Sequence, residues 1–355
     1  DFVLIFTIRK YSFGIIIILL FPNVLISQSF NDFERSNTEA RFVFYNTENL
    51  FDIYKDSVKR DEDFTPDGAK HWDKWKYYEK QENLSKVIIS IGGWDLPELV
   101  AFCEIENKKV LYDLTNYTSL KNKGYEIIHF ESPDRRGIDV GFIYLKDKIE
   151  VLEAEPITIN FPWDSNYKTR DILHARLLLF KTDTLHFFVC HWPSKWGGHL
   201  ETDKSRFLVG SVLKKEIDKT YNENPGAKIL VMGDMNDTPF DESLIVGLGA
   251  KTDTVNCKRN SLVNLSAAFV NDKIGTHKYQ DSWSVIDHVI VNYDLLGPNN
   301  SMHVKDRRAY VFKEDYLIEK DLKFFGEKPF RTYVGMRYNG GYSDHLPVFV
   351  DFKLR

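Results

Sequence analysis

Six short polar segments of the sequence carry carboxylate, amide and imidazole side chains, and each lies beside a run of apolar residues. Such side chains exchange protons, and carboxylates also bind hard cations, so the segments can support acid–base or metal-assisted chemistry. Four segments follow their apolar run: Asn46-Thr47-Glu48-Asn49, Glu104-Ile105-Glu106-Asn107, His191-Trp192-Pro193-Ser194-Lys195 and Gly233-Asp234-Met235-Asn236-Asp237. Two precede it: Ile286-Asp287-His288 and Ser343-Asp344-His345.

The apolar runs beside these segments are short and rich in β-branched and aromatic residues, which predicts strands. Loop-bearing strand ends on a rigid scaffold are where binding and catalytic residues concentrate. Four strands end in a polar segment, and two strands begin after one. If those two strands run antiparallel to the other four, all six polar segments meet at one edge of the sheets. The sequence therefore predicts one composite site.

Each segment taken alone has an ordinary structural explanation. A Gly-Asp pair after a strand is more often a turn, and an Asp-His pair is usually a surface or capping feature. Cys103 and Cys190 are expected to pack as small core residues. His288 is expected to face away from the site, because adjacent strand residues point to opposite sides. Only the combination of the six segments carries the functional prediction.

The rest of the chain predicts the elements that must hold these segments. Strands are expected at 41–45, 99–103, 140–145, 172–180, 185–190, 228–232, 285–291 and 347–352. Apolar spacing predicts helices around 84–91 and 110–117, and a third over 202–221 that stops at Asn224-Pro225-Gly226. Strands mixed with fewer helices over one continuous stretch indicate a single α/β domain, with sheet-on-sheet packing and helices outside.

Two stretches, 54–74 and 295–342, lack a clear apolar period. Loops of this length inside a compact domain are usually lids or binding loops, and a tolerated surface insertion is nearly as common. Asp61-Glu62-Asp63 in the first stretch does not match the spacing of an EF-hand Ca²⁺ loop, so a solvated acidic loop is expected.

Composition narrows the class of protein. The 355 residues are 43% apolar and 28% charged, with 47 Lys and Arg against 52 Asp and Glu, a net charge of −5. This excludes collagen-like, low-complexity and wholly disordered chains, and it argues against a broad electrostatic grip on nucleic acid. The three cysteines form no C-x-x-C pair, which argues against a disulfide scaffold or a thiolate zinc site. The G-x-S-x-G, H-E-x-x-H and G-x-x-x-x-G-K-[ST] motifs are also absent from the sequence.

Residues 1–28 have the pattern of a secretory signal peptide. Arg9 and Lys10 precede an apolar run over 11–26, and small polar residues follow it. The run is short for a membrane span and Pro22 interrupts it, so an uncleaved anchor and a buried helix are less favoured. Residues 29–40 are expected to be a short linker before one domain over 41–355. The protein is thus expected to be exported, periplasmic or secreted, with membrane contact only through the signal segment.

The six segments, in this order and at this spacing, resemble the endonuclease/exonuclease/phosphatase superfamily. That superfamily includes pancreatic-type deoxyribonucleases, apurinic endonucleases, sphingomyelinases and inositol-polyphosphate phosphatases. The resemblance extends from about Arg41 to the C-terminus, and its most specific part combines Gly233-Asp234-x-Asn236 with Ser343-Asp344-His345. The sequences around His191 and Asn46 are similar to exported bacterial members described as endonuclease-like. The resemblance implies a four-layer α/β sandwich, with two packed mixed sheets flanked by helices, and phosphoester hydrolysis with a divalent metal.

The resemblance also implies metal-binding roles. Glu104 is the expected principal ligand, because a hard carboxylate at a strand end suits Mg²⁺, with Mn²⁺ or Ca²⁺ as alternative cofactors. Asn46 is expected to add a carbonyl oxygen or to orient Glu104, and Asp344 is a further expected ligand. Turn capping is the structural alternative for these three residues.

Phosphoester cleavage needs an activated water and stabilisation of the phosphoryl charge. Asp234 is the expected general base, and Asn236 is expected to hydrogen-bond the same water or the phosphate. His345 is expected to contact a phosphoryl oxygen as a charged donor, while Asp287 orients its imidazole and raises its pKa.

Three further residues receive roles of their own. His191 resembles the second phosphate-contacting histidine of the deoxyribonuclease branch. Apurinic endonucleases carry a tyrosine there, so this departure argues against abasic-site repair. Arg170 is an additional expected phosphate contact. Asp139, just before a strand, could support the site residues, but a structural role is the favoured interpretation.

Three functions remain open at this point. The leading one is an exported Mg²⁺-dependent nuclease that cuts DNA or RNA as a monomer, without a stable protein partner. The candidates for small phosphate-binding patches are Arg135-Arg136, Lys195 and Arg307-Arg308. Trp192 and Trp196 could be exposed and stack on bases, and packing in the core or at its rim is an equally open alternative for both. The second keeps the chemistry on a phosphomonoester or a phospholipid headgroup, with Lys323-Phe324-Phe325-Gly326 approaching a membrane. The third, a binding module without catalysis, is disfavoured because the whole catalytic set is present.

Overall fold

The computed structural model describes residues 35–36, 38–195 and 199–355. The expected signal peptide and most of the expected linker lie outside the described residues, as does Trp196, so these interpretations remain predictions. No helix in the described part of the chain is long and apolar enough to cross a membrane.

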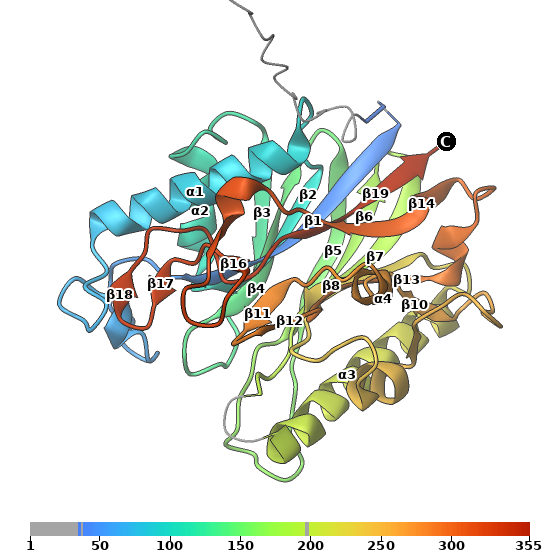
Figure 1. The fold of residues 1–355 in the computed structure, drawn as a ribbon. Helices are drawn as coiled ribbons and strands as arrows, with labels where there is room; N and C mark the ends of the chain where they lie inside the picture. Colours follow the sequence, from blue (N-terminus) through green and yellow to red (C-terminus); the bar gives the residue numbers. More distant parts are fainter. Residues whose placement is uncertain (1–34, 37, 196–198) are drawn as a thin grey trace, which may run out of the picture. The chain divides into compact units, whose positions relative to one another are not determined.

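Two mixed β-sheets pack face to face (Figure 1). The first has the order β14-β19-β1-β2-β4-β3 and the second β5-β6-β7-β8-β13-β10-β9. The strands of the six-stranded sheet are β1 (Glu39–Leu50), β2 (Leu99–Ile105), β3 (Tyr125–His129), β4 (Asp139–Leu145), β14 (Met302–Val311) and β19 (Val348–Leu354). The strands of the seven-stranded sheet are β5 (Ile149–Ile157), β6 (Ile172–Leu179), β7 (Asp183–His191), β8 (Ile229–Asp234), β9 (Ala250–Lys251), β10 (Leu262–Asn264) and β13 (Asp287–Asn292). The seven-stranded sheet is therefore built from one continuous stretch, and the six-stranded sheet from both sides of it.

Helices cover the outer faces of the two sheets (Figure 1). α1 (Lys74–Gly92) and α2 (Lys108–Asn116) pack on the six-stranded sheet, and α3 (His199–Glu223) packs on the other. The short helical segments are α4 (Ala267–Asn271), Glu62–Phe64, Ser243–Leu248, Tyr293–Leu296 and Asp315–Leu317. The hairpins outside the large sheets are β11 (His277–Tyr279) with β12 (Ser282–Ser284), β15 (Ile318–Lys320) with β16 (Glu327–Pro329), and β17 (Tyr333–Val334) with β18 (Arg337–Tyr338). The predicted four-layer sandwich is confirmed.

Buried apolar side chains hold the layers together. Phe42 of β1 packs edge-on against Phe187 of β7, with ring centroids 5.8 Å apart, and so joins the two sheets. Cys103 lies in this inter-sheet core, whereas Cys190 faces the layer of α3, and both are buried as predicted. The helix predicted around 84–91 forms the second half of α1, whose apolar side chains face the six-stranded sheet.

The stretch 295–342 is not a loop throughout, so that prediction was wrong. It contains β14, an edge strand of the six-stranded sheet, together with two of the small hairpins. The pairing of β14 with β19 shifts register between Val304 and Ala309, and Asp306 and Arg307 adopt left-handed backbone angles (φ 55° and 53°). This bulge of charged residues interrupts the alternation that would have marked the strand.

Strand direction brings the six polar segments to one edge. β1 runs parallel to β2, and β7 runs parallel to β8, so these four strands end together in pairs. β13 runs antiparallel to β8, which places Asp287 opposite Asp234. β19 runs antiparallel to β1, so that Asp344 and His345, just before β19, lie at the end of β1. The predicted antiparallel arrangement is confirmed.

Gly233 allows β7 and β8 to approach closely at this edge. A Cβ atom at Gly233 would lie 2.4 Å from the carbonyl oxygen of Cys190, a backbone atom that cannot move aside alone. The next residue pair in register is His191 with Asp234. The absence of a side chain at Gly233 thus sets the distance between two predicted site residues.

Candidate active site

His345 lies between two buried aspartates. Its Nδ1 hydrogen-bonds Asp287 Oδ2 at 2.8 Å, and its Nε2 lies 3.8 Å from Asp234 Oδ2. Burial alone would lower the pKa of His345, but the charges of Asp287, Asp234 and Asp344 outweigh it and hold that pKa well above its usual value. The imidazole is therefore protonated at neutral pH, and its Nε2–H is a charged hydrogen-bond donor within the site.

Asp234, at the end of β8, combines burial with two hydrogen bonds. Its Oδ2 accepts from Asn46 Nδ2 at 3.0 Å, and its Oδ1 accepts from the backbone N–H of Asn236 at 2.9 Å. Burial raises the pKa of Asp234 to about 7, with Asp287 adding to the rise and His345 opposing it. A carboxyl group with a pKa near neutrality is suited to accept a proton from water.

Asn236 is turned toward the loop after β7. Its side-chain Nδ2 donates to the carbonyl oxygen of Trp192 at 3.1 Å, and its backbone is left-handed, with φ 53°. This hydrogen bond links the residues that follow β8 to those that follow β7. Its predicted contact with water or phosphate remains a prediction.

His191 is paired in register with Asp234 and faces the same space. Its Nε2 lies 3.7 Å from Asp234 Oδ2 and 3.9 Å from Glu104 Oε1, while its buried Nδ1 has no hydrogen-bond partner among the described residues. Burial lowers the pKa of His191 well below its usual value, and Arg170 and Arg136 lower it further. His191 is therefore a neutral imidazole beside a charged one.

Arg170 is enclosed behind His191 and is not at the surface. Only 3% of its side chain is exposed; Nη1 donates to Asp134 Oδ2 at 3.1 Å, and Nη2 donates to the carbonyl oxygen of Trp192. Its positive charge lowers the pKa values of both His191 and Glu104, so it acts on the site through its field.

Glu104 and Asp344 supply the carboxylates predicted to hold the metal. Glu104 Oε2 accepts from the backbone N–H of Asn49 at 2.9 Å, and Oε1 has no hydrogen-bond partner within the described parts of the chain. Burial raises the pKa of Glu104, and Asp344 raises it further, so the two charges act on each other. Burial would also raise the pKa of Asp344, but Arg331 and His345 lower it to about 2. A carboxylate oxygen without a hydrogen bond, in the field of a second carboxylate, fits a hard divalent cation such as Mg²⁺.

Asn46 contacts the predicted base and not Glu104. Its Nδ2 donates to Asp234, and its Oδ1 accepts from the backbone N–H of Glu48 at 2.9 Å. The backbone of Asn49, three residues on, is what orients Glu104. The side-chain oxygen Oδ1 of Asn46 retains one lone pair for a cation.

The structure adds residues that the sequence did not single out. His277 of β11 lies against His345, with ring centroids 4.7 Å apart, and burial lowers its pKa to about 4. Lys80 of α1 is buried and donates to Thr332 Oγ1 at 2.5 Å and to the carbonyl oxygen of Tyr342 at 2.6 Å. Arg331 binds Glu48 and Asp344. Glu48 belongs to a polar segment noted above, whereas Arg331 and His277 come from stretches without a distinctive pattern.

One expectation about a neighbouring residue is confirmed, and a second remains open. His288 points away from the site, where its Nε2 lies 2.8 Å from the carbonyl oxygen of Asp237 and its Nδ1 lies 3.0 Å from Asn264 Nδ2. Asp139 accepts from the backbone N–H of Ser132 and lies 3.1 Å from His129 Nε2, and its structural role remains a prediction.

Of the two alternatives for Trp192, exposure for base stacking is wrong and packing in the core is confirmed. Its side chain is 0% exposed, because it fills the core between the seven-stranded sheet and α3. The basic patches are also largely engaged: Lys195 pairs with Asp237 at 3.1 Å, and Arg308 pairs with Asp272.

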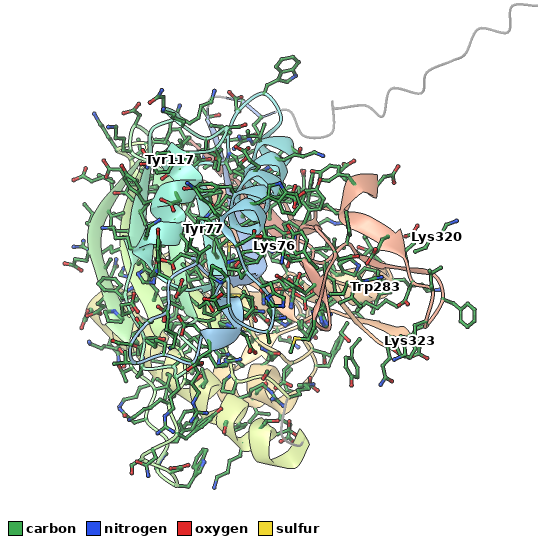
Figure 2. The ribbon with its side chains drawn as sticks, turned by 90° about the vertical axis from the view of Figure 1, so that its left-hand side faces the viewer. Lys76, Tyr77, Tyr117, Trp283, Lys320 and Lys323 are labelled. Atoms are coloured by element: carbon green, nitrogen blue, oxygen red, sulfur yellow. The ribbon has the colours of Figure 1, made fainter. Side chains whose placement is uncertain are left out.

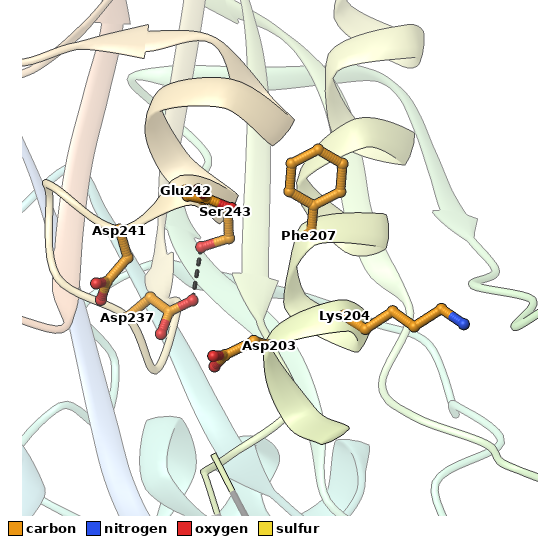
Figure 3. A pocket seen from close by; sticks show the side chains of 7 residues that line it. All are labelled: Asp203, Lys204, Phe207, Asp237, Asp241, Glu242 and Ser243. Atoms are coloured by element: carbon orange, nitrogen blue, oxygen red, sulfur yellow. Dashed lines mark hydrogen bonds between the residues drawn. The ribbon is translucent and has the colours of Figure 1, made fainter. Parts of the chain in front are cut away.

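A pocket of about 450 Å³ adjoins the strand end that carries Asp234, on the side of α3 (Figure 3). Its lining residues are Asp203, Lys204, Phe207, Asp237, Asp241, Glu242 and Ser243. Asp237 accepts a hydrogen bond from Ser243 Oγ at 2.6 Å (Figure 3). It also pairs with the buried Arg206 at 2.7 Å. None of the predicted catalytic residues belongs to this lining, so the pocket is a neighbour of the site and not its centre.

Comparison with solved structures finds the same fold in several proteins. An endonuclease/exonuclease/phosphatase family protein from Bacteroides thetaiotaomicron is 16% identical, with a TM-score of 0.56. The comparison covers 90% of this chain and 98% of that chain. The mannosyl-6-phosphatase of the same organism is 16% identical over 88% and 99% of the two chains, with a TM-score of 0.55. TDP2 from D. rerio, complexed with a single-strand DNA product, is 14% identical over 89% and 100%, with a TM-score of 0.53. At these identities the likeness concerns the fold.

No curated protein is significantly similar in sequence to this chain. Residues 41–354 match the Endonuclease/Exonuclease/phosphatase family, over almost the whole of the two sheets and the edge that carries the site. Members of such a family act on phosphoesters and typically depend on a divalent metal, which agrees with the carboxylates and imidazoles gathered here. The chain belongs to the endonuclease/exonuclease/phosphatase family.

Proposed function

We propose that the protein is an exported, divalent-metal-dependent phosphodiester hydrolase whose substrate is DNA or RNA. The observation that carries the proposal is the position of His345 between Asp287 and Asp234, beside the carboxylates of Glu104 and Asp344. A charged donor, a carboxyl group with a pKa of about 7 and a pair of cation-binding carboxylates are the groups that water attack on a phosphoester requires.

Each residue has a distinct part in this proposal. Asp234 takes a proton from the attacking water, and Asn46 keeps that carboxylate in place through its hydrogen bond. His345 donates to a non-bridging phosphoryl oxygen, and His191 donates a neutral N–H to the same group. Glu104 and Asp344 would hold Mg²⁺, with the carbonyl oxygen of Asn46 as a further ligand, and a bound cation would neutralise phosphate charge.

Cleavage of supercoiled plasmid and of a single-stranded RNA by the full chain, with Mg²⁺ and with EDTA, tests the proposal. Asp234→Ala and His345→Ala are each expected to lower the rate by at least ~100-fold. Asp147→Ala, which alters an exposed aspartate on another edge, serves as the matched control. Activity that persists in EDTA, or that both substitutions leave unchanged, would contradict the proposal.

Export is supported by the sequence pattern of residues 1–28 alone. Expression of the full chain in a bacterial host should yield a shortened protein outside the cytoplasm. N-terminal sequencing of that product is expected to find a start near Gln28. A full-length product retained in the cytoplasm would contradict export without affecting the proposed chemistry.

One observation favours a second substrate class, a phospholipid headgroup. The hairpin of β15 and β16 ends in a turn where Leu322 is 90% exposed and Phe325 is 83% exposed. Figure 2 shows Lys320 and Lys323 at the outer end of the same hairpin. Apolar side chains flanked by lysines suit an anionic membrane surface.

The turn is also firmly built. Asp321 Oδ1 accepts from the backbone N–H groups of Lys323 and Phe324, both at 3.0 Å, and Asp321 Oδ2 pairs with Lys278 at 3.0 Å. Hydrolysis of phospholipid in anionic vesicles, lost in Leu322→Ser/Phe325→Ser while bis-p-nitrophenyl phosphate is still cleaved, would favour this candidate. Cleavage of nucleic acid with inert vesicles would exclude it.

A further inference from the structure

Arg331 bridges two carboxylates, those of Glu48 and Asp344. Its Nε lies 3.1 Å from Glu48 Oε1, and its Nη2 lies 2.8 Å from Asp344 Oδ2. Asp344 is one of the two carboxylates assigned to the metal, so the guanidinium stands directly beside the predicted cation site. This position gives Arg331 a larger influence on the site than its place in a long connecting stretch suggests.

Backbone contacts fix the segment that carries Arg331. The buried Glu48 accepts from the backbone N–H groups of Thr332 at 2.6 Å and Tyr333 at 3.3 Å, so one carboxylate binds three consecutive residues. Lys80, buried beneath, donates to Thr332 Oγ1 from the other side. The guanidinium is therefore presented by a rigid support, as substrate-positioning residues require.

Arg331 keeps donors available for a ligand. A guanidinium has five N–H groups, and the contacts with Glu48 and Asp344 use two of them. Its side chain is 38% exposed, whereas that of Arg170 is 3% exposed and Lys80 is buried. Arg331 is therefore a cation that binds Asp344 directly and that a substrate can reach.

We propose that Arg331 binds a phosphate oxygen of the substrate, and that without substrate it neutralises Asp344 in competition with the metal. This inference rests on the proposed phosphoester hydrolysis and adds a residue to it. A guanidinium forms paired, charge-assisted hydrogen bonds with phosphate, and its charge repels a nearby cation. Removing it should therefore weaken phosphate binding and strengthen metal binding, two changes of opposite sign.

Calorimetric titrations of the full chain with MnCl₂ alone, and then with inorganic phosphate at saturating Mn²⁺, measure the two effects without turnover. Arg331→Gln is expected to bind phosphate about tenfold or more weakly and to bind Mn²⁺ several-fold more tightly, as loss of one charge-assisted hydrogen bond implies. Arg331→Lys keeps the positive charge but not the planar guanidinium group that can form paired hydrogen bonds. It should bind Mn²⁺ like the wild type and phosphate with intermediate affinity. Arg337→Gln removes an equal charge from the exposed β18 and should change neither.

Weaker binding of both ligands by Arg331→Gln, with a lower melting temperature, would mean that Arg331 only supports the fold and would overturn the inference. Unchanged phosphate affinity would overturn it as well. The outcome is separable from the proposed function, because binding is measured without hydrolysis. Plasmid or small-ester cleavage that continues with an unchanged KM in Arg331→Gln would leave the function standing and reject the role of Arg331.

Discussion

Asp287 and Asp234 stand opposite each other in register on the antiparallel strands β13 and β8, and one imidazole serves both carboxylates. Nδ1 of His345 hydrogen-bonds Asp287, and Nε2 faces Asp234. The hydrogen-bonded Asp287 fixes the orientation of the ring. Asp234 has no such direct bond to His345, and its pKa rises to about 7. Geometry thus distinguishes the two aspartates: Asp287 supports the imidazole, and Asp234 is the proposed proton acceptor.

Asp287→Asn should shift the alkaline limb of the pH–rate profile to lower pH. Asp287 raises the pKa of His345, so an uncharged amide lets the imidazole lose its proton at lower pH. The expected shift exceeds about one pH unit, with a rate loss of about 10²-fold at pH 8. A profile of kcat/KM from pH 5 to 10 checks this, and a uniform loss at all pH values would assign Asp287 a purely structural role.

Asp234→Asn should remove activity without destabilising the protein. The single amide oxygen can accept from Asn46 Nδ2 or from the backbone N–H of Asn236 but not from both, so one hydrogen bond is lost. The larger cost of burying a charge disappears at the same time. We expect a melting temperature equal to or above that of the wild type at pH 8, with a rate at least ~100-fold lower. Thermal unfolding beside a nuclease assay decides the point, and a large fall in melting temperature would contradict it.

Glu106→Gln should stabilise the protein at alkaline pH. Burial raises the pKa of Glu106 to about 8, and Asp52 and Asp61 add to the rise. Between the unfolded pKa of about 4.3 and this value the folded state binds more protons, so stability falls as the pH rises. The variant should match the wild type near pH 4 and exceed it by on the order of 2 kcal/mol near pH 9. Urea unfolding at both pH values, with the exposed Glu150→Gln as control, measures this difference.

Asp351→Ala should strongly destabilise the six-stranded sheet. Asp351 of β19 receives two hydrogen bonds of 2.7 Å from Arg41 of β1, and both residues are buried. Removing one partner of a buried ion pair costs about 3–5 kcal/mol, because the other charge stays buried. The double variant Arg41→Met/Asp351→Leu should recover most of the loss. Denaturant midpoints of the single and double variants test this, and equal destabilisation by both would contradict it.

The sequence predicted the layers and the composite site because both depend on local patterns. Apolar runs predicted the positions of the strands. The polar segment at one end of each of six strands predicted where the functional side chains would lie. The meeting of Asp234 with His345 needed one more step, the strand directions, which are inferred only when six segments are considered together.

Other features depend on contacts between distant residues and have no local signal. Trp192 follows a polar histidine and reads as a loop residue, yet it is buried because α3 returns over the strand end. β14 was missed because a charged bulge breaks its alternation. Arg331 lies more than 280 residues from Glu48, and only the folded chain shows that the two side chains meet.

The order of the strands along the chain has a consequence for synthesis. The seven-stranded sheet can assemble as soon as its continuous stretch has been made, whereas the six-stranded sheet must wait for β19 to pair with β1. Asp344 and His345 immediately precede that strand. A growing polypeptide therefore cannot acquire hydrolytic capacity before β19 has emerged from the ribosome, and a polypeptide terminated before β19 does not acquire it.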